Sequence, residues 1–275
     1  MIHAFTTLRT EIDRRVMTVT LDNPPINLMD RSMLRDLRAL LDALLLDHEI
    51  RAVVFHSANP DFFICHADLS LFKERAAPPK SEKLNFIHTL FEQYRTLPKA
   101  TIAMIEGRCN GAGTEFATSL DMQFAAIGRA FIGQFEVALG ALPGGTGTQR
   151  LPALMGRSRA LELILGSDEL DAGTAERYGL VNRALAADKI GPFVDALARR
   201  IATFPLDAIA LAKKSVDQGL GDPTAALSEE SFLAGQLMAT PEVRRRFAAI
   251  LEHGAQTPTG ERDLAQLLPK LGATA

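Results

Sequence analysis

Residues 106–115 read EGRCNGAGTE and connect an apolar strand to a helix through a glycine-rich turn. The preceding residues, 101–105, predict the strand, and the residues from the turn to Leu120 predict the helix. Backbone N–H groups at such a turn, together with the positive end of the helix, can bind an anion or an oxyanion. Glu115 falls in the first helical turn, where a carboxylate can also act as a simple cap. The turn lacks the G-x-G-x-x-G spacing of dinucleotide-binding proteins.

Strands and helices alternate on both sides of this turn. Short β-branched or apolar runs predict the strands, and apolar residues at helical spacing predict the helices. The predicted strands are 16–21, 52–55, 101–105 and 122–126, and the predicted helices include 33–45 and 84–97. Asp30 or Ser32 is expected to cap the helix at 33–45. This alternation is typical of an α/β protein with a parallel sheet.

Strands become rare after about residue 146, and helices follow instead. The predicted helices are 190–201, 208–219, 224–238 and 241–253. We therefore expect an α/β core over residues 1–200 and a helical C-terminal region over residues 201–275. Residues after Gly254 are rich in Gly, Pro and Thr, and we expect them to be only partly ordered.

Composition excludes several classes of protein. The 275 residues are 47% hydrophobic, which is enough for a full core. A net charge of −3 provides no basic field for nucleic acid. Two cysteines, Cys65 and Cys109, are typical of a reducing compartment, and no stretch approaches the ~18 apolar residues of a membrane span. We expect a cytoplasmic protein with no nucleic-acid or membrane partner and, because no His/Asp/Glu cluster has ligand spacing, no metal.

Two further segments carry chemical groups. Residues 62–69 read FFICHADL and follow a predicted strand, so their backbone N–H groups could receive a ligand oxygen, although an ordinary loop with an Asp cap has the same pattern. Residues 133–136 read GQFE, and a second glycine-rich turn, PGGTGTQR, follows at 143–150. A phosphate-binding P-loop is excluded because no Lys follows these glycines.

Together the segments resemble the enoyl-CoA hydratase/isomerase (crotonase) superfamily. Residues 67–69, 107–115 and 143–151 are similar to its two oxyanion-hole segments and its signature. Residues 23–27 and 171–181 are similar to its first loop and to a later helix and turn. The resemblance covers roughly residues 5–220. It implies a crotonase-like (ClpP/crotonase) spiral of repeated ββα units with a C-terminal helical region that closes the acyl pocket and packs on a neighbouring subunit, in a homotrimer or a dimer of trimers.

The resemblance also implies the site. The backbone N–H groups of Ala67 and Ala112 would polarise a thioester carbonyl, Glu115 would activate water, and Glu136 would deliver a proton to Cα. Residues expected to contact the acyl-CoA substrate are Asn27, Leu28, Cys65, His66, Ala67, Asp68, Leu69 and Gly111. No separate cofactor is implied, because coenzyme A is part of the substrate.

Three departures from the family pattern leave the reaction open. His66 replaces a usual Gly, Phe135 replaces a usual Pro, and the C-terminal stretch differs. Hydration of a 2-enoyl-CoA to a 3-hydroxyacyl-CoA is the preferred interpretation because both glutamates are present. The alternatives are an enoyl-CoA isomerase, a decarboxylase, a thioester hydrolase or a non-catalytic acyl-CoA binding protein. We expect His66 to point away from the pocket, and Cys65 and His66 to face opposite sides of an extended strand.

Overall fold

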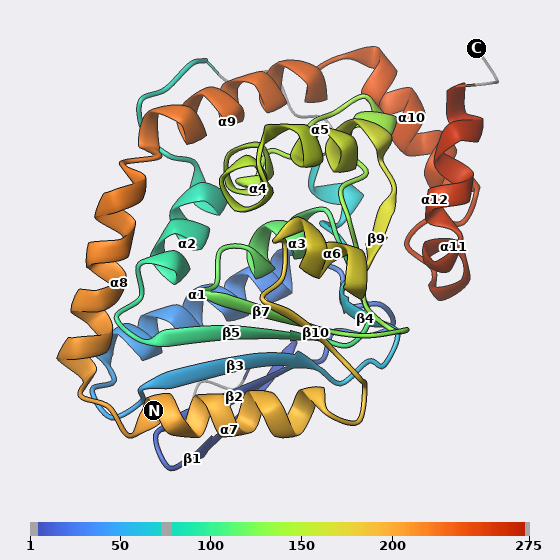
Figure 1. Ribbon diagram of the computed structural model, residues 1–275. Coiled ribbons are helices and arrows are strands. Elements are labelled where there is room, and N and C mark those ends of the chain that lie inside the picture. Colours follow the sequence, from blue (N-terminus) through green and yellow to red (C-terminus); the bar gives the residue numbers. More distant parts are fainter. Residues whose placement is uncertain (1–4, 73–78, 273–275) are drawn as a thin grey trace.

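A computed structural model describes residues 5–72 and 79–272, and two sheets form its centre (Figure 1). The larger sheet has six strands in the order β1-β2-β3-β5-β7-β10. Their bounds are β1 Leu8–Asp13, β2 Val16–Leu21, β3 Ala52–Ser57, β5 Ala100–Ile105, β7 Met122–Ala126 and β10 Arg183–Leu185. Strand β1 is antiparallel to β2, and the other neighbours in this sheet are parallel.

The smaller sheet has four strands in the order β4-β6-β8-β9. Their bounds are β4 Phe62–Ile64, β6 Arg108–Asn110, β8 Phe131–Gly133 and β9 Glu169–Asp171. Successive strand pairs β3–β4, β5–β6 and β7–β8 each place the first strand in the larger sheet and the second in the smaller one. This repetition is the spiral of ββα units that the family resemblance implied. The three-residue strands β4, β6 and β8 were not predicted, because an alternating pattern cannot be recognised over three residues.

Helices enclose both faces of the larger sheet (Figure 1). The first seven are α1 Arg31–Leu46, α2 Phe86–Arg95, α3 Ala112–Ala117, α4 Gly147–Met155, α5 Arg157–Gly166, α6 Ala172–Tyr178 and α7 Ile190–Ala202. Alternating residues of each strand face opposite cores: Val53 and Phe55 of β3 pack in the main core, whereas Ala52 and Val54 pack toward α7. Asp30 caps α1 by accepting from the Met33 N–H at 2.8 Å, as one of the two predicted caps.

The C-terminal residues form a helical run along the outside of this core (Figure 1). Its helices are α8 Leu206–Leu220, α9 Thr224–Met238, α10 Pro241–Glu252, α11 Pro258–Arg262 and α12 Leu264–Leu267. Short 3-10 helices occur at η1 Leu69–Phe72, η2 Val137–Leu139 and η3 Leu268–Gly272. None of the helices within residues 5–72 and 79–272 is long and apolar enough to cross a membrane.

The expectation of a partly ordered stretch after Gly254 was wrong for its described residues. Leu264, Leu268 and Leu271 pack in a buried cluster with Leu69 and Phe135 from the core. A sequence rich in Gly, Pro and Thr is stable here because Pro258 begins a helix and Thr257 caps it. The apolar contacts then hold this helix against the rest of the protein.

Candidate active site

The three predicted chemical segments meet at one cavity of about 910 Å³. His66 and Ala67 line it from the end of β4, Ala112 and Glu115 from α3, and Glu136 from the segment after β8. The parallel pairing of β4, β6 and β8 explains this convergence, since the carboxyl ends of parallel strands lie at one edge of a sheet. The structure therefore brings together residues that are up to 70 positions apart in the chain.

Ala67 presents its backbone to the cavity. The His66 C=O accepts from Met29 N at 2.9 Å, and Asp68 N donates to the Met29 C=O at 3.1 Å. In this parallel bridge the N–H and C=O of Ala67 itself face away from Met29. Among the described residues the Ala67 N–H has no hydrogen-bond partner, so it can donate to a ligand oxygen.

Ala112 is the first residue of α3, and its N–H lacks an intrahelical partner by position. Gly111 precedes it with φ 51°, in the left-handed region that favours glycine. A Cβ atom on Gly111 would also lie 2.8 Å from Oε1 of Glu136 and 3.3 Å from Cβ of His66. Because residue 111 is glycine, the Ala112 N–H and the Glu136 carboxylate can lie close together in the cavity wall.

Glu115 is buried and held by the second glycine-rich turn. Its Oε1 accepts from Gly145 N at 2.7 Å and from Gly147 N at 2.9 Å. Burial, followed by the negative charges of Glu136 and Glu230, raises the pKa of Glu115 well above its usual range, although the two N–H bonds lower it. The turn thus fixes one oxygen of Glu115 and leaves the other available to a ligand.

Glu136 is half-buried beside Gln134 and His66. In the orientation that satisfies its amide, Gln134 donates to Glu136, with its nitrogen 2.8 Å from Oε2 and 3.1 Å from Oε1. Burial raises the pKa of Glu136 to about 7, against the lowering effects of backbone N–H groups and of the charge on His66. Two neighbouring acids of this kind hold a proton between them over a range of pH, so that one is an acid and the other a base.

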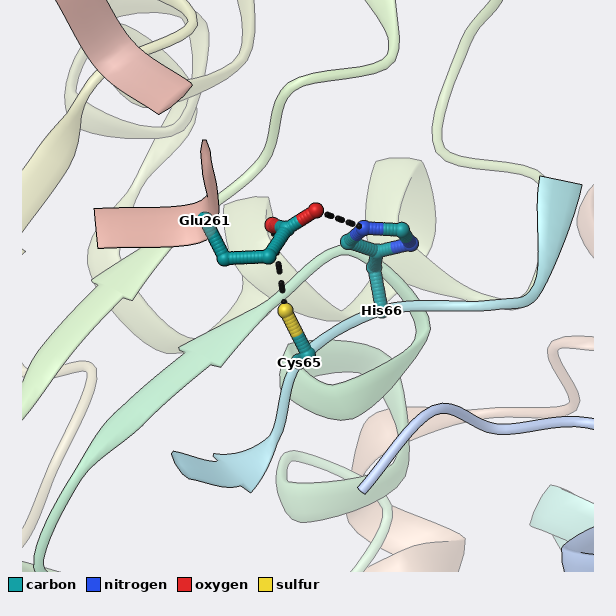
Figure 2. A group of neighbouring side chains, drawn as sticks. All are labelled: Cys65, His66 and Glu261. Atoms are coloured by element: carbon teal, nitrogen blue, oxygen red, sulfur yellow. Dashed lines mark hydrogen bonds and ion pairs between the residues drawn. The ribbon is translucent and has the colours of Figure 1, made fainter. Parts of the chain in front are cut away.

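His66 is one of the residues that line the cavity, although it was expected to point away, and its ring turns toward Glu261 (Figure 2). Its Nε2 lies 3.0 Å from Oε1 of Glu261, and the Cys65 thiol donates to Oε2 of the same carboxylate at 3.1 Å. The expected opposite orientation of Cys65 and His66 was wrong, because β4 ends at Ile64 and strand alternation stops there.

The Cys65 sulfur, a His66 ring nitrogen and a Glu261 carboxylate oxygen lie within 4.8 Å of one another and could hold a metal ion. Their mutual hydrogen bonds already satisfy all three groups.

Four of the predicted substrate-contacting residues do not line the cavity in the described part of the chain, namely Asn27, Leu28, Cys65 and Asp68. The Asn27 side chain is buried and donates to the Phe63 C=O at 3.0 Å, which ties its loop to β4. Asp68 caps the turn at Ser70 and accepts from Gln256. These side chains shape the loop around the cavity, whereas His66, Ala67, Leu69 and Gly111 face the cavity itself.

Glu230 is a third buried carboxylate that the sequence did not indicate. It lies on α9 and accepts from His88 Nε2 at 2.9 Å, Thr146 N at 2.7 Å and Thr148 N at 3.0 Å. Alternate N–H groups of the turn thus bind Glu115 and Glu230. One of two adjacent glutamates in a long helix carries no local signal of this role, and only the fold brings α9 to the turn.

The rest of the cavity wall consists of a basic part and an apolar part. Arginines from α1 contribute to the wall at positions 31, 35 and 38. Apolar side chains form much of the remaining wall, and several belong to α9, α10 and α12: Ala234, Met238, Phe247, Ile250 and Leu264. The basic triplet at 244–246 is used elsewhere, since Arg245 and Arg246 pair with Glu242 and Arg246 donates to the Ala138 C=O.

The family model for enoyl-CoA hydratase/isomerase matches residues 11–256 of this chain. This protein belongs to the enoyl-CoA hydratase/isomerase family. Short-chain-enoyl-CoA hydratase from Clostridium acetobutylicum is 30% identical over 245 residues, which cover 88% of this chain and 93% of that protein. Methylglutaconyl-CoA hydratase of mouse mitochondria is 33% identical over 227 residues, 78% of this chain and 70% of that one.

The fold of this family member is confirmed by a solved structure. A Streptomyces avermitilis protein provisionally named enoyl-CoA hydratase has a crystal structure that superposes with a TM-score of 0.90. It is 38% identical in sequence, and the match covers 98% of this chain and 100% of that one. The crotonase fold predicted from the sequence is therefore the fold of this protein.

Proposed function

We propose that this enzyme hydrates a 2-enoyl-CoA to a 3-hydroxyacyl-CoA. The observation that carries the proposal is the placement of two carboxylates, Glu115 and Glu136, in the same cavity as the N–H groups of Ala67 and Ala112. Two acids serve a reaction that both activates water and delivers a proton. Two N–H donors in one cavity serve a substrate whose carbonyl oxygen gains negative charge during the reaction.

The thioester carbonyl would accept hydrogen bonds from Ala67 and Ala112. These bonds draw electrons from the conjugated double bond, make Cβ electrophilic, and stabilise the enolate oxygen that forms next. Removing one donor from such a site lowers kcat about 10²–10³-fold in other enzymes. Both donors belong to the backbone, so Ala side chains are compatible with the role.

The glutamates would then complete the addition of water. Glu115 accepts one proton from water while the water oxygen bonds to Cβ and the carbon–carbon π electrons move toward the carbonyl. Glu136 gives its proton to Cα as the enolate collapses, so the product gains one OH and one H. Proton exchange through water then returns the proton from Glu115 to Glu136. General acid–base catalysis contributes about 10²–10⁴-fold.

The wall of the cavity matches the two halves of an acyl-CoA. Arg31, Arg35 and Arg38 provide positive charge for coenzyme A phosphates, and the apolar residues of α9, α10 and α12 provide a surface for the acyl chain. Closure of the acyl pocket by the C-terminal region, residues 201–275, belongs to this proposal. The mechanism uses no cofactor besides the coenzyme A of the substrate and no metal.

A homotrimer, or a dimer of trimers, is part of the same proposal. No residue of α8 is buried, although Leu211, Val216 and Leu220 on it are apolar and 64%, 66% and 74% exposed. Apolar side chains grouped on one helix favour contact with a neighbouring subunit. We also place the protein in the cytoplasm, because Cys65 and Cys109 are buried thiols that fit a reducing compartment.

The first experiment measures loss of the conjugated enoyl absorbance when the protein is mixed with crotonyl-CoA. We expect rapid loss with the natural sequence and at least a 10²-fold slower rate with Glu115→Gln, because the amide cannot take the proton from water. Glu252→Gln, an exposed change on α10, is the matched control and is expected to retain the rate. Unchanged hydration by Glu115→Gln would contradict the two-acid mechanism, and isomerisation of a 3-enoyl-CoA by that variant would favour a one-base isomerase.

A further inference from the structure

The turn around α11 docks on the loop that carries Ala67. Arg262 pairs with Asp61, Glu261 contacts both Cys65 and His66, and Gln256 Nε2 donates to Asp68 at 3.1 Å. These contacts follow residues 61–68 in order, although the partners lie about 190 positions apart in the chain. The C-terminal turn therefore recognises the loop along its length and not at a single point.

Glu261 is held rigidly where it meets the loop. It is 1% exposed, and its Oε1 also accepts from Gln256 N at 2.6 Å. Gly260 precedes it and packs so closely that a Cβ atom there would lie 2.0 Å from the Gly254 carbonyl oxygen. A carboxylate that is buried and bonded in this way has a fixed position relative to the C-terminal turn.

His66 connects this carboxylate to the oxyanion-hole residue. Its Nε2 lies 3.0 Å from Glu261 Oε1, and its Nδ1 lies 2.7 Å from the C=O of Ala67. Both ring nitrogens face acceptors, so only the doubly protonated imidazolium satisfies both contacts. The imidazole ring thus binds the C=O of Ala67, whereas Met29 binds only the two neighbouring residues, His66 and Asp68.

We propose that Glu261 is a positioning residue that acts through His66 to fix the Ala67 N–H, and so couples docking of the C-terminal turn to assembly of the oxyanion hole. The inference rests on the proposed function for the role of Ala67. The oxyanion hole is then complete only when residues 254–262 are docked on the loop 61–68. Contacts of the acyl chain with α10 and α12 favour this docked state.

The charges around His66 are consistent with this link. Facing it are Glu261 on α11, Glu136 at the start of η2 and Asp68 in its own loop. Burial lowers the pKa of His66, but the charge and hydrogen bond of Glu261, the Ala67 carbonyl and Glu136 outweigh burial and raise it to about 9. Burial also raises the pKa of Glu261, but His66 and the Gln256 N–H lower it overall. The pair is therefore ionised throughout the neutral range.

The test compares full-length Glu261→Gln, His66→Gln and the double variant, with the exposed Glu252→Gln as control. We expect each single change to lower kcat about 10–100-fold with KM within about 3-fold, because a misplaced donor weakens transition-state binding. If the residues act through one another, the double variant is no more than about 3-fold slower than the slower single variant. Thermal unfolding of each variant shows that it is folded.

Two readouts do not depend on turnover. The NMR titration of His66 should give a pKa near 9 in the natural protein and a lower one in Glu261→Gln. The Raman carbonyl frequency of a bound enoyl-CoA should shift down less in Glu261→Gln, because Ala67 polarises the carbonyl less. If the natural protein fails to hydrate but these two differences appear, the proposed reaction is wrong and the positioning role stands.

Three results would overturn the inference. The first is a folded Glu261→Gln with the natural kcat and carbonyl shift. The second is a double variant whose loss is the product of the single losses, because independent effects multiply. The third is loss of activity on removal of metal with a chelator, which would mean that Cys65, His66 and Glu261 hold an ion instead of an ion pair.

Discussion

At the residue scale, the two glutamates differ in how they are held. Glu115 is bonded to two backbone N–H groups of a tight turn, whereas Glu136 is bonded to the Gln134 side chain and lies near His66. Both carboxylates are therefore held in orientation, Glu115 by backbone N–H groups of the turn and Glu136 by the Gln134 amide and the backbone N–H groups of its own segment.

The pH dependence of hydration follows from the pKa of Glu136. That pKa is raised to about 7 and the pKa of Glu115 is raised as well, so the two carboxyl groups titrate as a coupled pair that reacts while it holds one proton. We expect a bell-shaped profile in which kcat/KM for hydration falls about 10-fold per pH unit where the pair holds both protons and again where it holds none. His66 keeps its charge to about pH 9 and adds no limb between pH 6 and 8. A flat rate from pH 6 to 9 would contradict Glu136 as the acid.

A pair of glycine substitutions tests how closely Glu115 is held. Gly145→Ala would place a Cβ atom 2.6 Å from Glu115 Oε2, and we expect kcat to fall about 10²-fold as the carboxylate shifts. Gly166→Ala is the control, because a Cβ atom there meets no atom within 4 Å. It should keep the natural rate and raise the free energy of unfolding by about 0.5–1 kcal/mol. Equal rates for both variants would exclude tight packing around Glu115.

At the element scale, short turns determine the site more than the long helices do. The turn 143–148 presents alternate N–H groups to Glu115 on α3 and to Glu230 on α9. One short segment therefore fixes Glu115, the proposed water base, and anchors helix α9. The turn around α11 plays the corresponding part for the loop that carries Ala67.

Substitutions at two adjacent glutamates on α9 test whether Glu230 anchors the turn. Glu230→Gln leaves at least one buried donor among His88, Thr146 and Thr148 without an acceptor, which should lower the free energy of unfolding by about 1–3 kcal/mol. Glu229→Gln removes only an exposed ion pair with Lys80 and should change the free energy of unfolding by less than about 1 kcal/mol. Chemical denaturation measures the free energy of unfolding of both variants. Similar values for the two variants would mean that Glu230 does not anchor the turn.

At the scale of the whole molecule, helix α8 carries exposed apolar side chains, and none of its residues is buried. We expect the protein to sediment as a trimer or hexamer, and the pair Leu211→Lys and Val216→Lys on α8 to dissociate it, because charges replace apolar contacts. Leu46→Lys, a change at a residue 80% exposed at the end of α1, is the control and should leave the mass unchanged. A natural protein that sediments as a monomer would contradict the proposed assembly.

Much of the fold was predictable because its signals are local. Strand β2 and helix α9 have the predicted bounds, and α1, α7 and α10 differ from prediction by a few residues, since their apolar spacing is regular. Helix α3 ends at Ala117 and not at Leu120, because Thr118 and Ser119 bond back to carbonyl oxygens of the last turn. The order of the motifs also identified the family, and it predicted as site residues Ala67, Ala112, Glu115 and Glu136, which line one cavity.

Only the tertiary structure showed which buried carboxylates anchor the C-terminal helices to the core. Glu230 lies in a predicted helix and Glu261 in a stretch that was expected to be only partly ordered, and the partners of both lie far away in the chain. Their roles depend on where α9 and α11 pack, and that depends on apolar contacts summed over the whole molecule. By itself the sequence determined most of the elements and the family, and it indicated Glu115 and Glu136 as the proposed catalytic pair, because each of these depends on local spacing or on a motif. The environment of His66 arises from long-range packing, which no local pattern encodes.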